Sequence, residues 1–126
     1  MEKIDFFQEG ENALSQAEEY IDIDMCDDGL VFHYLQNAAL NYLKALGKEF
    51  NLDVEGISSL RELVQEIESK TTVKFPDFIE HIVEMDETTL STGCSTSLCF
   101  DMDFYGDIYE AVQSLREFVS ERITEG

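Results

Sequence analysis

Residues 27–50, DDGLVFHYLQNAALNYLKALGKEF, carry the pattern that decides the fold. Apolar side chains recur there at steps of three and four residues, which is the spacing of one face of an α-helix. Further apolar residues widen this face until little polar surface remains, so the helix has to be covered on several sides. We therefore expect it at the centre of a helical bundle. The stripe comprises Phe32, Leu35, Ala39, Tyr42, Leu46 and Phe50, widened by Val31, Ala38, Leu40, Leu43 and Ala45.

The two ends of this central helix have recognisable signals. Asp27 or Asp28 supplies an N-cap oxygen and places negative charge at the positive end of the helix dipole. At the other end, Gly47 or the region of Asn51 is expected to stop the helix.

Four further helices are predicted around it. Residues 4–23 form the first, Ser59 to Glu62 matches a capping box that opens the third, and Pro76 suits the first turn of the fourth. The last begins near residues 104–107. The expected buried faces are Phe6, Phe7, Gly10, Ala13, Leu14, Ala17, Tyr20 and Ile21; Leu60, Leu63, Val64 and Ile67; Phe75, Phe78, Ile79, Ile82, Val83 and Met85; and Ile108, Val112, Leu115, Phe118 or Val119, and Ile123.

These helices, joined mostly by short loops, predict an all-α fold, a four- to five-helix antiparallel up-and-down bundle. With 126 residues and 44% hydrophobic content, the chain is expected to be one domain, residues 1–126, with a core that needs no disulfide or metal. Residues 88–103 lack helical periodicity, and both an ordered and a flexible surface loop fit their composition.

Charge is the most unusual feature of the composition. The chain has 28 acidic and 8 basic residues, a formal net charge of −20. Nucleic-acid binders neutralise phosphates with clustered Lys and Arg, so direct binding to nucleic acid or to anionic lipid is not expected. Solubility or an acidic proteome is one explanation of this charge, and a surface complementary to a basic partner is the other.

The cysteines and the apolar runs bear on localisation. Cys26, Cys94 and Cys99 are odd in number and sparsely placed. The first residues lack the basic start and apolar run of a signal peptide, and no apolar run approaches the roughly 20 residues that span a bilayer. We expect a cytoplasmic protein with reduced thiols and no membrane association.

Motifs for metal binding or catalysis are weak. Cys94 and Cys99 lack the spacing and the paired histidine of a zinc site, and His81, between Glu80 and Glu84, fits a solvated acidic helix face better than a metal site. No nucleophile elbow and no phosphate-binding glycine loop occurs in the sequence. We therefore expect no metal, no cofactor and no catalytic residue.

Taken together, the elements resemble the HEPN family of small helical bundles. The match begins at Ala13-x-x-x-Ala17-x-x-Tyr20 and is best over residues 32–46, FHYLQNAALNYLKAL, where the family runs approximately Gln-Gln-Ala-Ala-Glu-Lys-x-Leu-Lys-Ala-Leu. It continues in SSLREL, residues 58–63, where the family commonly has His-x-Leu-x-x-Leu. The resemblance covers nearly the whole chain.

Three positions depart from the family pattern, and a catalytic pair is missing. Leu40 and Asn41 stand where the family often has Glu and Lys, and Ser58 stands where it often has His. Family members that cut RNA carry an Arg, then four to six intervening residues, and then a His. No arginine of this chain has a histidine at that distance. We therefore do not expect ribonuclease activity.

The resemblance implies a non-catalytic HEPN-like binding protein in a toxin–antitoxin-like context. Its partner would be a small nucleotidyltransferase, a bound nucleotide, or both, and the family implies a homodimer. Lys44 and Arg61 are the candidate cations for a ligand or partner, and Gln36 and Asn37 the candidate polar groups, with ordinary surface solvation or helix capping as the alternative for all four. Two other functions stay open: RNA cleavage through an unorthodox site such as His81 with a nearby arginine, and an acidic inhibitor that mimics nucleic acid.

Overall fold

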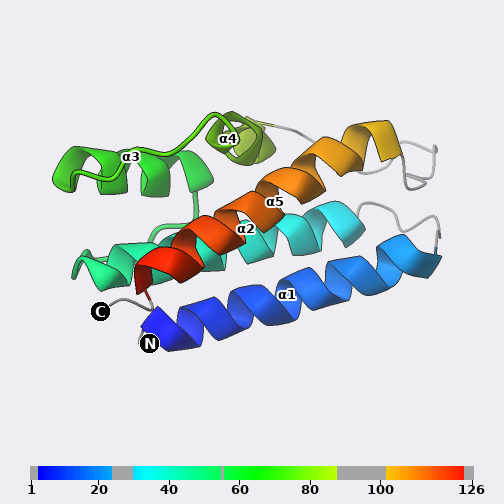
Figure 1. Cartoon of the computed structure of the whole chain (residues 1–126), viewed down its shortest axis with the longest axis horizontal. Helices are drawn as coiled ribbons and strands as arrows, with labels where there is room; N and C mark the ends of the chain where they lie inside the picture. The colour runs from blue at the N-terminus through cyan, green and yellow to red at the C-terminus, as the bar shows by residue number, and fades with distance from the viewer. Residues whose placement is uncertain (1–2, 24–29, 55, 88–101, 124–126) are drawn as a thin grey trace.

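The chain folds into an all-α helical bundle (Figure 1). The computed structural model describes residues 3–23, 30–54, 56–87 and 102–123. Within them lie five helices and no strand: α1 (Lys3–Ile23), α2 (Leu30–Glu49), α3 (Leu60–Lys70), α4 (Ile79–Glu87) and α5 (Met102–Ile123). The predicted fold class is confirmed. The expected N-cap at Asp27 or Asp28, the three cysteines and most of the predicted 88–103 loop lie outside the described residues.

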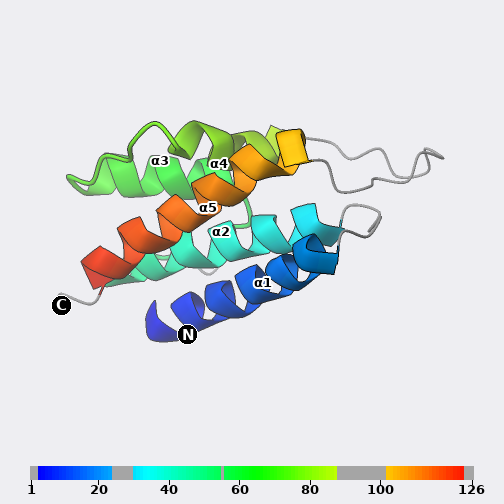
Figure 2. The same cartoon turned by 45° about the vertical axis from the view of Figure 1, so that its right-hand side comes forward.

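Helix α2 occupies the centre of the bundle, as its broad apolar girth predicts. It packs against α1, α3, α4 and α5. Helices α1 and α2 run antiparallel, and α3 and α4 lie on the other side of α2 from α1 (Figures 1 and 2). Helix α5 runs obliquely across the bundle in the same sense as α2. Both long helices, α1 and α5, therefore pack on α2, and α5 also packs against α4.

One hydrophobic cluster joins all five helices. The inner stripe of α2 is fully buried, and Phe6, Leu60, Ile82 and Leu115 bring the other four helices to it. Burial of this apolar surface is the main free-energy term that holds the bundle together. The α2 residues with no exposed surface are Leu35, Ala38, Ala39, Tyr42, Leu43, Ala45 and Leu46.

Phe50 does not belong to this core, which corrects the prediction. Its side chain is 38% exposed, because α2 ends at Glu49 and the next residues turn away from the helix axis. Asn51 takes a left-handed backbone conformation with φ of 62°, and the Leu52 N–H donates to the Gly47 carbonyl at 3.0 Å. This six-to-one bond after a left-handed residue is a Schellman motif, so the Asn51 region, and not Gly47, ends the helix.

The start of α3 follows the predicted capping signal. Ser59 has an extended backbone, and its Oγ accepts a hydrogen bond from the Glu62 N–H at 3.3 Å. One of the first-turn donors, which have no partner inside the helix, is thereby satisfied.

The start of α4 differs from the prediction. Pro76 lies three residues before the helix, in a turn where its carbonyl accepts from the Ile79 N–H at 3.0 Å. This turn holds Phe75 and Phe78 against Phe118 of α5, with ring centroids 5.1 and 6.0 Å apart. The two phenylalanines are half-buried and pack against the core, so their predicted role is retained although the helix begins later.

Two glycines allow close approach inside the bundle. A Cβ at Gly10 in α1 would lie 2.8 Å from the ring of Tyr42, and a Cβ at Gly47 would lie 2.6 Å from Val54 Cγ1. Real Cβ atoms do not approach other atoms so closely, so a larger residue at either position requires a shift of its neighbour. Gly10 is therefore what allows the tyrosine ring to pack directly on α1.

None of the helices in the described part of the chain combines the length and apolar content needed to cross a membrane.

Candidate functional site: a polar groove between the first and last helices

Among the described residues, a network of an ion pair and side-chain hydrogen bonds joins α1 to α5. Arg116 of α5 donates from Nε to Glu11 Oε1 and from Nη2 to Glu11 Oε2, the second at 3.1 Å. Tyr42 of α2 donates its hydroxyl to the same Glu11 Oε1 at 2.7 Å. Two donors from an arginine and one from a tyrosine thus converge on one carboxylate. The two arginine bonds have the bidentate geometry that guanidinium groups favour with carboxylates.

The surroundings of these groups shift their pKa values. Burial opposes ionisation of Glu11, but the hydrogen bonds from Arg116 and Tyr42 outweigh it, and the Glu11 pKa is lowered. Burial, followed by the bond to Glu11, raises the pKa of Tyr42 far above its ordinary value. The bond to Glu11 raises the pKa of Arg116. The hydrogen bonds within this group therefore favour an ionised Glu11 and a protonated Tyr42.

A second link lies two turns further along α1. The Tyr109 hydroxyl of α5 donates to Glu18 Oε2 at 2.5 Å, and Gln113 Nε2 donates to the Tyr109 oxygen at 2.9 Å. The two glutamates of α1, seven residues apart, face the same side of the helix because seven residues make nearly two turns. Both bind side chains of α5.

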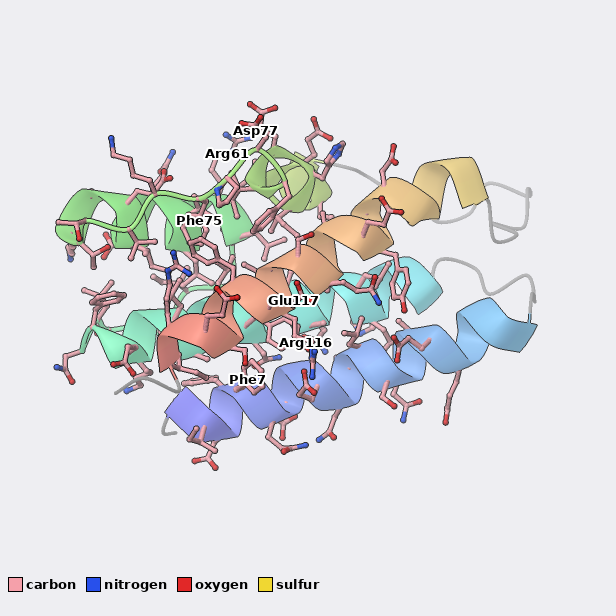
Figure 3. All side chains as sticks on the ribbon, viewed as in Figure 1. Phe7, Arg61, Phe75, Asp77, Arg116 and Glu117 are labelled. Atoms are coloured by element: carbon pink, nitrogen blue, oxygen red, sulfur yellow. The ribbon has the colours of Figure 1, made fainter. Side chains whose placement is uncertain are left out.

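A groove of about 470 Å³ lies between these two helices. In Figure 3, Arg116 extends from α5 toward α1, with Glu117 beside it on α5. Three of the seven lining residues are glutamates. The lining consists of Glu11, Leu14, Ser15, Glu18, Gln113, Arg116 and Glu117.

Two of the residues predicted from the sequence come together elsewhere. Gln36 and Asn37 line a hollow of about 150 Å³ beside His33 and Ser58. The amide of Gln36 donates to the Met85 carbonyl at 3.2 Å, which ties α2 to α4. Gln36 thus has a structural partner, and the hollow is smaller than the roughly 300 Å³ at which ligand pockets usually begin.

The two predicted cations lie apart from that hollow. The Lys44 ammonium lies 5.8 Å from the centroid of the Phe6 ring, where a cation–π contact joins α2 to α1. Arg61 is exposed on α3, and in Figure 3 it lies well away from Arg116. The structure therefore does not bring the four predicted residues into one site.

The described residues also bear on metal binding and on the histidine-based alternative. Among them, no group of three or more His, Cys, Asp or Glu side chains is arranged to hold a metal ion. His81 is half-exposed on α4, and its Nδ1 lies 3.8 Å from a carboxylate oxygen of Glu84.

Sequence reasoning missed the groove because its residues carry no local motif. Glu11 lies outside the apolar face of its helix, and Arg116 has no histidine downstream of it, so neither belongs to a recognisable motif. The available signal was the position of Arg116 on α5, one residue after the core residue Leu115, since an arginine there lies at the edge of the buried face.

No protein-family model, no curated protein and no solved structure matches this chain. Fold and site geometry are thus the grounds on which a function can be argued.

Proposed function

We propose that this chain is a non-catalytic binding protein whose acidic surface docks a basic protein. The observation that carries the proposal is that several of the few basic side chains are bound by groups of the same chain, which leaves an excess of acidic side chains at the surface. Arg116 is bound by Glu11, Arg122 lies 3.5 Å from the Phe118 ring centroid, and Lys70 pairs with Glu66 at 2.9 Å. With a net charge of −20, the potential around the molecule attracts cations and repels phosphates.

The excess of negative charge also favours one of the two partners that the HEPN resemblance implies, a nucleotidyltransferase, over the other, a nucleotide. A nucleotide would bring phosphates to the groove lined by three glutamates, or to a hollow of about 690 Å³ beside α3 whose lining has three acids and one lysine. The hollow of about 150 Å³ beside Gln36 is too small for it. A small nucleotidyltransferase with a basic surface meets neither obstacle. Within a HEPN-like, toxin–antitoxin-like context we therefore propose the protein partner and not the nucleotide.

Homodimer formation remains a separate proposal. The large apolar side chains that are exposed among the described residues are Ile4 at 58% and Phe50 at 38%. They lie at the start of α1 and just past the end of α2, which are neighbouring ends of two antiparallel helices (Figure 1). Sedimentation of the purified chain over a range of concentrations tests this proposal, and a monomer at all of them contradicts it.

The test of the proposed function is a pull-down with the tagged chain from its native cells, eluted by rising salt and identified by mass spectrometry. We expect stoichiometric recovery of a basic protein that elutes with salt and rebinds when purified. Recovery of the chain alone contradicts the proposal. Displacement of the partner by DNA or RNA identifies the nucleic-acid-mimic alternative, because a mimic occupies the partner's phosphate-binding groove.

A direct assay separates the ribonuclease alternative. The purified chain is incubated with single-stranded RNA, alone and with the His81→Ala variant beside it. We expect no cleavage by either protein. Cleavage that the His81 substitution abolishes overturns the non-catalytic assignment.

A further inference from the structure

Helices α1 and α5 both pack on α2, but they meet each other across a polar groove. Helix α1 buries its apolar face against α2, and α5 buries its own against α2 and α4. The groove of about 470 Å³ separates the two outer helices. Side chains cross it at two points, where Arg116 binds Glu11 and Tyr109 binds Glu18.

Both crossing points end on carboxylates of α1, so one chemical event acts on both. Hydrogen bonds to an ionised carboxylate are roughly twice as strong as those to a neutral carboxyl group. Uptake of a proton by Glu11 and by Glu18 therefore weakens each link. The core responds differently, because no polar or charged side chain is buried in the part of the chain that the structure describes. Acid thus acts on the links across the groove and leaves the apolar contacts with α2 in place.

The groups that face Glu11 come from two other helices. Arg116 of α5 and Tyr42 of α2 donate to it, and Glu117 lies beside Arg116 on the same groove wall. Arg116 is the one basic residue of the groove lining, and its side chain is 43% exposed. When Glu11 becomes neutral, the guanidinium loses its bidentate partner and is better satisfied by water and by Glu117.

Glu18 is faced by fewer groups. Tyr109 of α5 donates to it and in turn accepts from Gln113, and the charge of Glu18 also acts on Tyr42. No cation of the groove lining binds Glu18 in the described structure. Its link to α5 therefore depends on the charge of one carboxylate.

Other contacts hold each helix to its own neighbours. The Tyr42 ring lies directly over Gly10 and 5.3 Å from the centroid of Phe7, which ties α1 to α2. On the other side, Phe118 packs against Phe75 of the turn before α4 and so ties α5 to that turn. Neither contact involves a carboxylate, so both persist when the links across the groove weaken.

We propose that the α1–α5 groove is an acid-sensitive joint: protonation of Glu11 and Glu18 releases α5 from α1, and the groove widens while both helices stay packed on α2. This inference concerns the chain without any partner, so it is independent of the proposed function. The joint is closed at neutral pH. Because the pKa of Glu11 lies below its ordinary value of 4.5, the joint opens only as pH falls through that lower, folded value.

A distance across the groove tests the joint. Spin labels are attached at Ser15 of α1 and Glu110 of α5, both exposed, in a full-length chain whose three cysteines are replaced by serine. A second pair, at Ser15 and Asn37 of α2, does not cross the groove. Pulsed electron paramagnetic resonance gives both distances between about pH 7 and pH 3.5, with helicity followed by circular dichroism.

We expect the Ser15–Glu110 distance to lengthen on acidification by more than the width of its distribution at neutral pH, while the Ser15–Asn37 distance and the helicity stay constant. An unchanged Ser15–Glu110 distance overturns the proposal. Equal lengthening of both distances also overturns it, because the whole bundle then expands and the groove is not a separate joint.

Two double variants with the same change in charge sharpen the test at neutral pH. Glu11→Gln with Glu18→Gln imitates the protonated groove, whereas Glu9→Gln with Glu19→Gln neutralises two exposed acids of the same helix outside the groove lining. We expect the first set to lengthen the Ser15–Glu110 distance at pH 7 and the second to leave it unchanged. Equal effects of the two sets overturn the proposal, and the acid titration decides alone if the first set loses helicity.

Discussion

Arg116 of α5 and Glu11 of α1, 105 residues apart in the chain, form a two-point ion pair to which Tyr42 adds a third hydrogen bond. The pair bridges the first and last helices, both of which pack on α2. A second carboxylate of the groove, Glu18 of α1, accepts a hydrogen bond from Tyr109 of α5, so polar side chains join the two helices at two points.

The Glu11–Arg116 pair should contribute measurably to stability. In a double-mutant cycle with Glu11→Gln and Arg116→Gln, we expect a coupling free energy of about 1 kcal/mol, since bidentate, half-buried pairs exceed exposed ones. Urea unfolding followed by circular dichroism measures it. The matched control is Lys70 and Glu66, a more exposed pair on α3, for which we expect less than about 0.5 kcal/mol. Equal coupling in the two pairs contradicts this account.

The same pair predicts a pH dependence with a defined sign. The Glu11 pKa in the folded protein lies below its ordinary value of 4.5, so the unfolded chain binds the proton more readily. The stabilisation is therefore present above pH 4.5 and is lost as pH falls through the lower, folded value. We expect the difference in unfolding free energy between wild type and Glu11→Gln to be constant from pH 7 to 5.5 and to shrink below that. A difference that grows on acidification contradicts the assignment.

Gly10 should not tolerate a methyl group, although alanine is the better helix former. Gly10→Ala gains about 1 kcal/mol of helix propensity, but its Cβ would lie 2.8 Å from the Tyr42 ring. Overpacking of a close-packed site costs more than that gain, so we expect a net loss of about 1–2 kcal/mol in the free energy of unfolding.

The same substitution in a protein that lacks the Tyr42 ring isolates the effect of the contact between residue 10 and the ring. In the Tyr42→Leu protein the ring is absent, so Gly10→Ala should be neutral or stabilising there. Ser15→Ala, at an exposed position of the same helix, serves as the control for propensity alone. A loss of the same size in both backgrounds means that the tyrosine is not the cause.

The fold could be predicted from the sequence because its signals are local. The apolar stripe of α2, the capping residue Ser59 and the turn at Asn51 each act within one or two helical turns, and each is confirmed. The helical period predicts a buried Phe50 because the apolar spacing continues one residue past the end of the helix at Glu49. Pro76 was placed inside α4 because a proline at a first turn and one in the preceding turn have the same sequence pattern.

The candidate site could not be predicted in the same way. Glu11 and Arg116 meet only through the packing of α1 and α5 on α2, and no spacing rule relates residues 105 positions apart. Lys44 was a reasonable candidate cation, but its contact with the Phe6 ring depends on how α1 crosses α2. Long-range polar pairs of this kind require the tertiary structure.

The Ser59 cap offers a simple test of local stability. Ser59→Ala removes the Oγ that accepts from the Glu62 N–H, and we expect a loss of about 1 kcal/mol in the free energy of unfolding. Ser58→Ala, one residue earlier and exposed, should change it by less than about 0.5 kcal/mol. Equal effects at the two serines contradict the assignment of Ser59 as the cap.

The salt dependence of partner binding decides whether the acidic surface of this chain docks a basic protein. The protein recovered in the pull-down is titrated by calorimetry into the purified chain at several salt concentrations. We predict an affinity that falls steeply as the salt concentration rises, because screening weakens the attraction between opposite charges. An affinity independent of salt contradicts the proposed function.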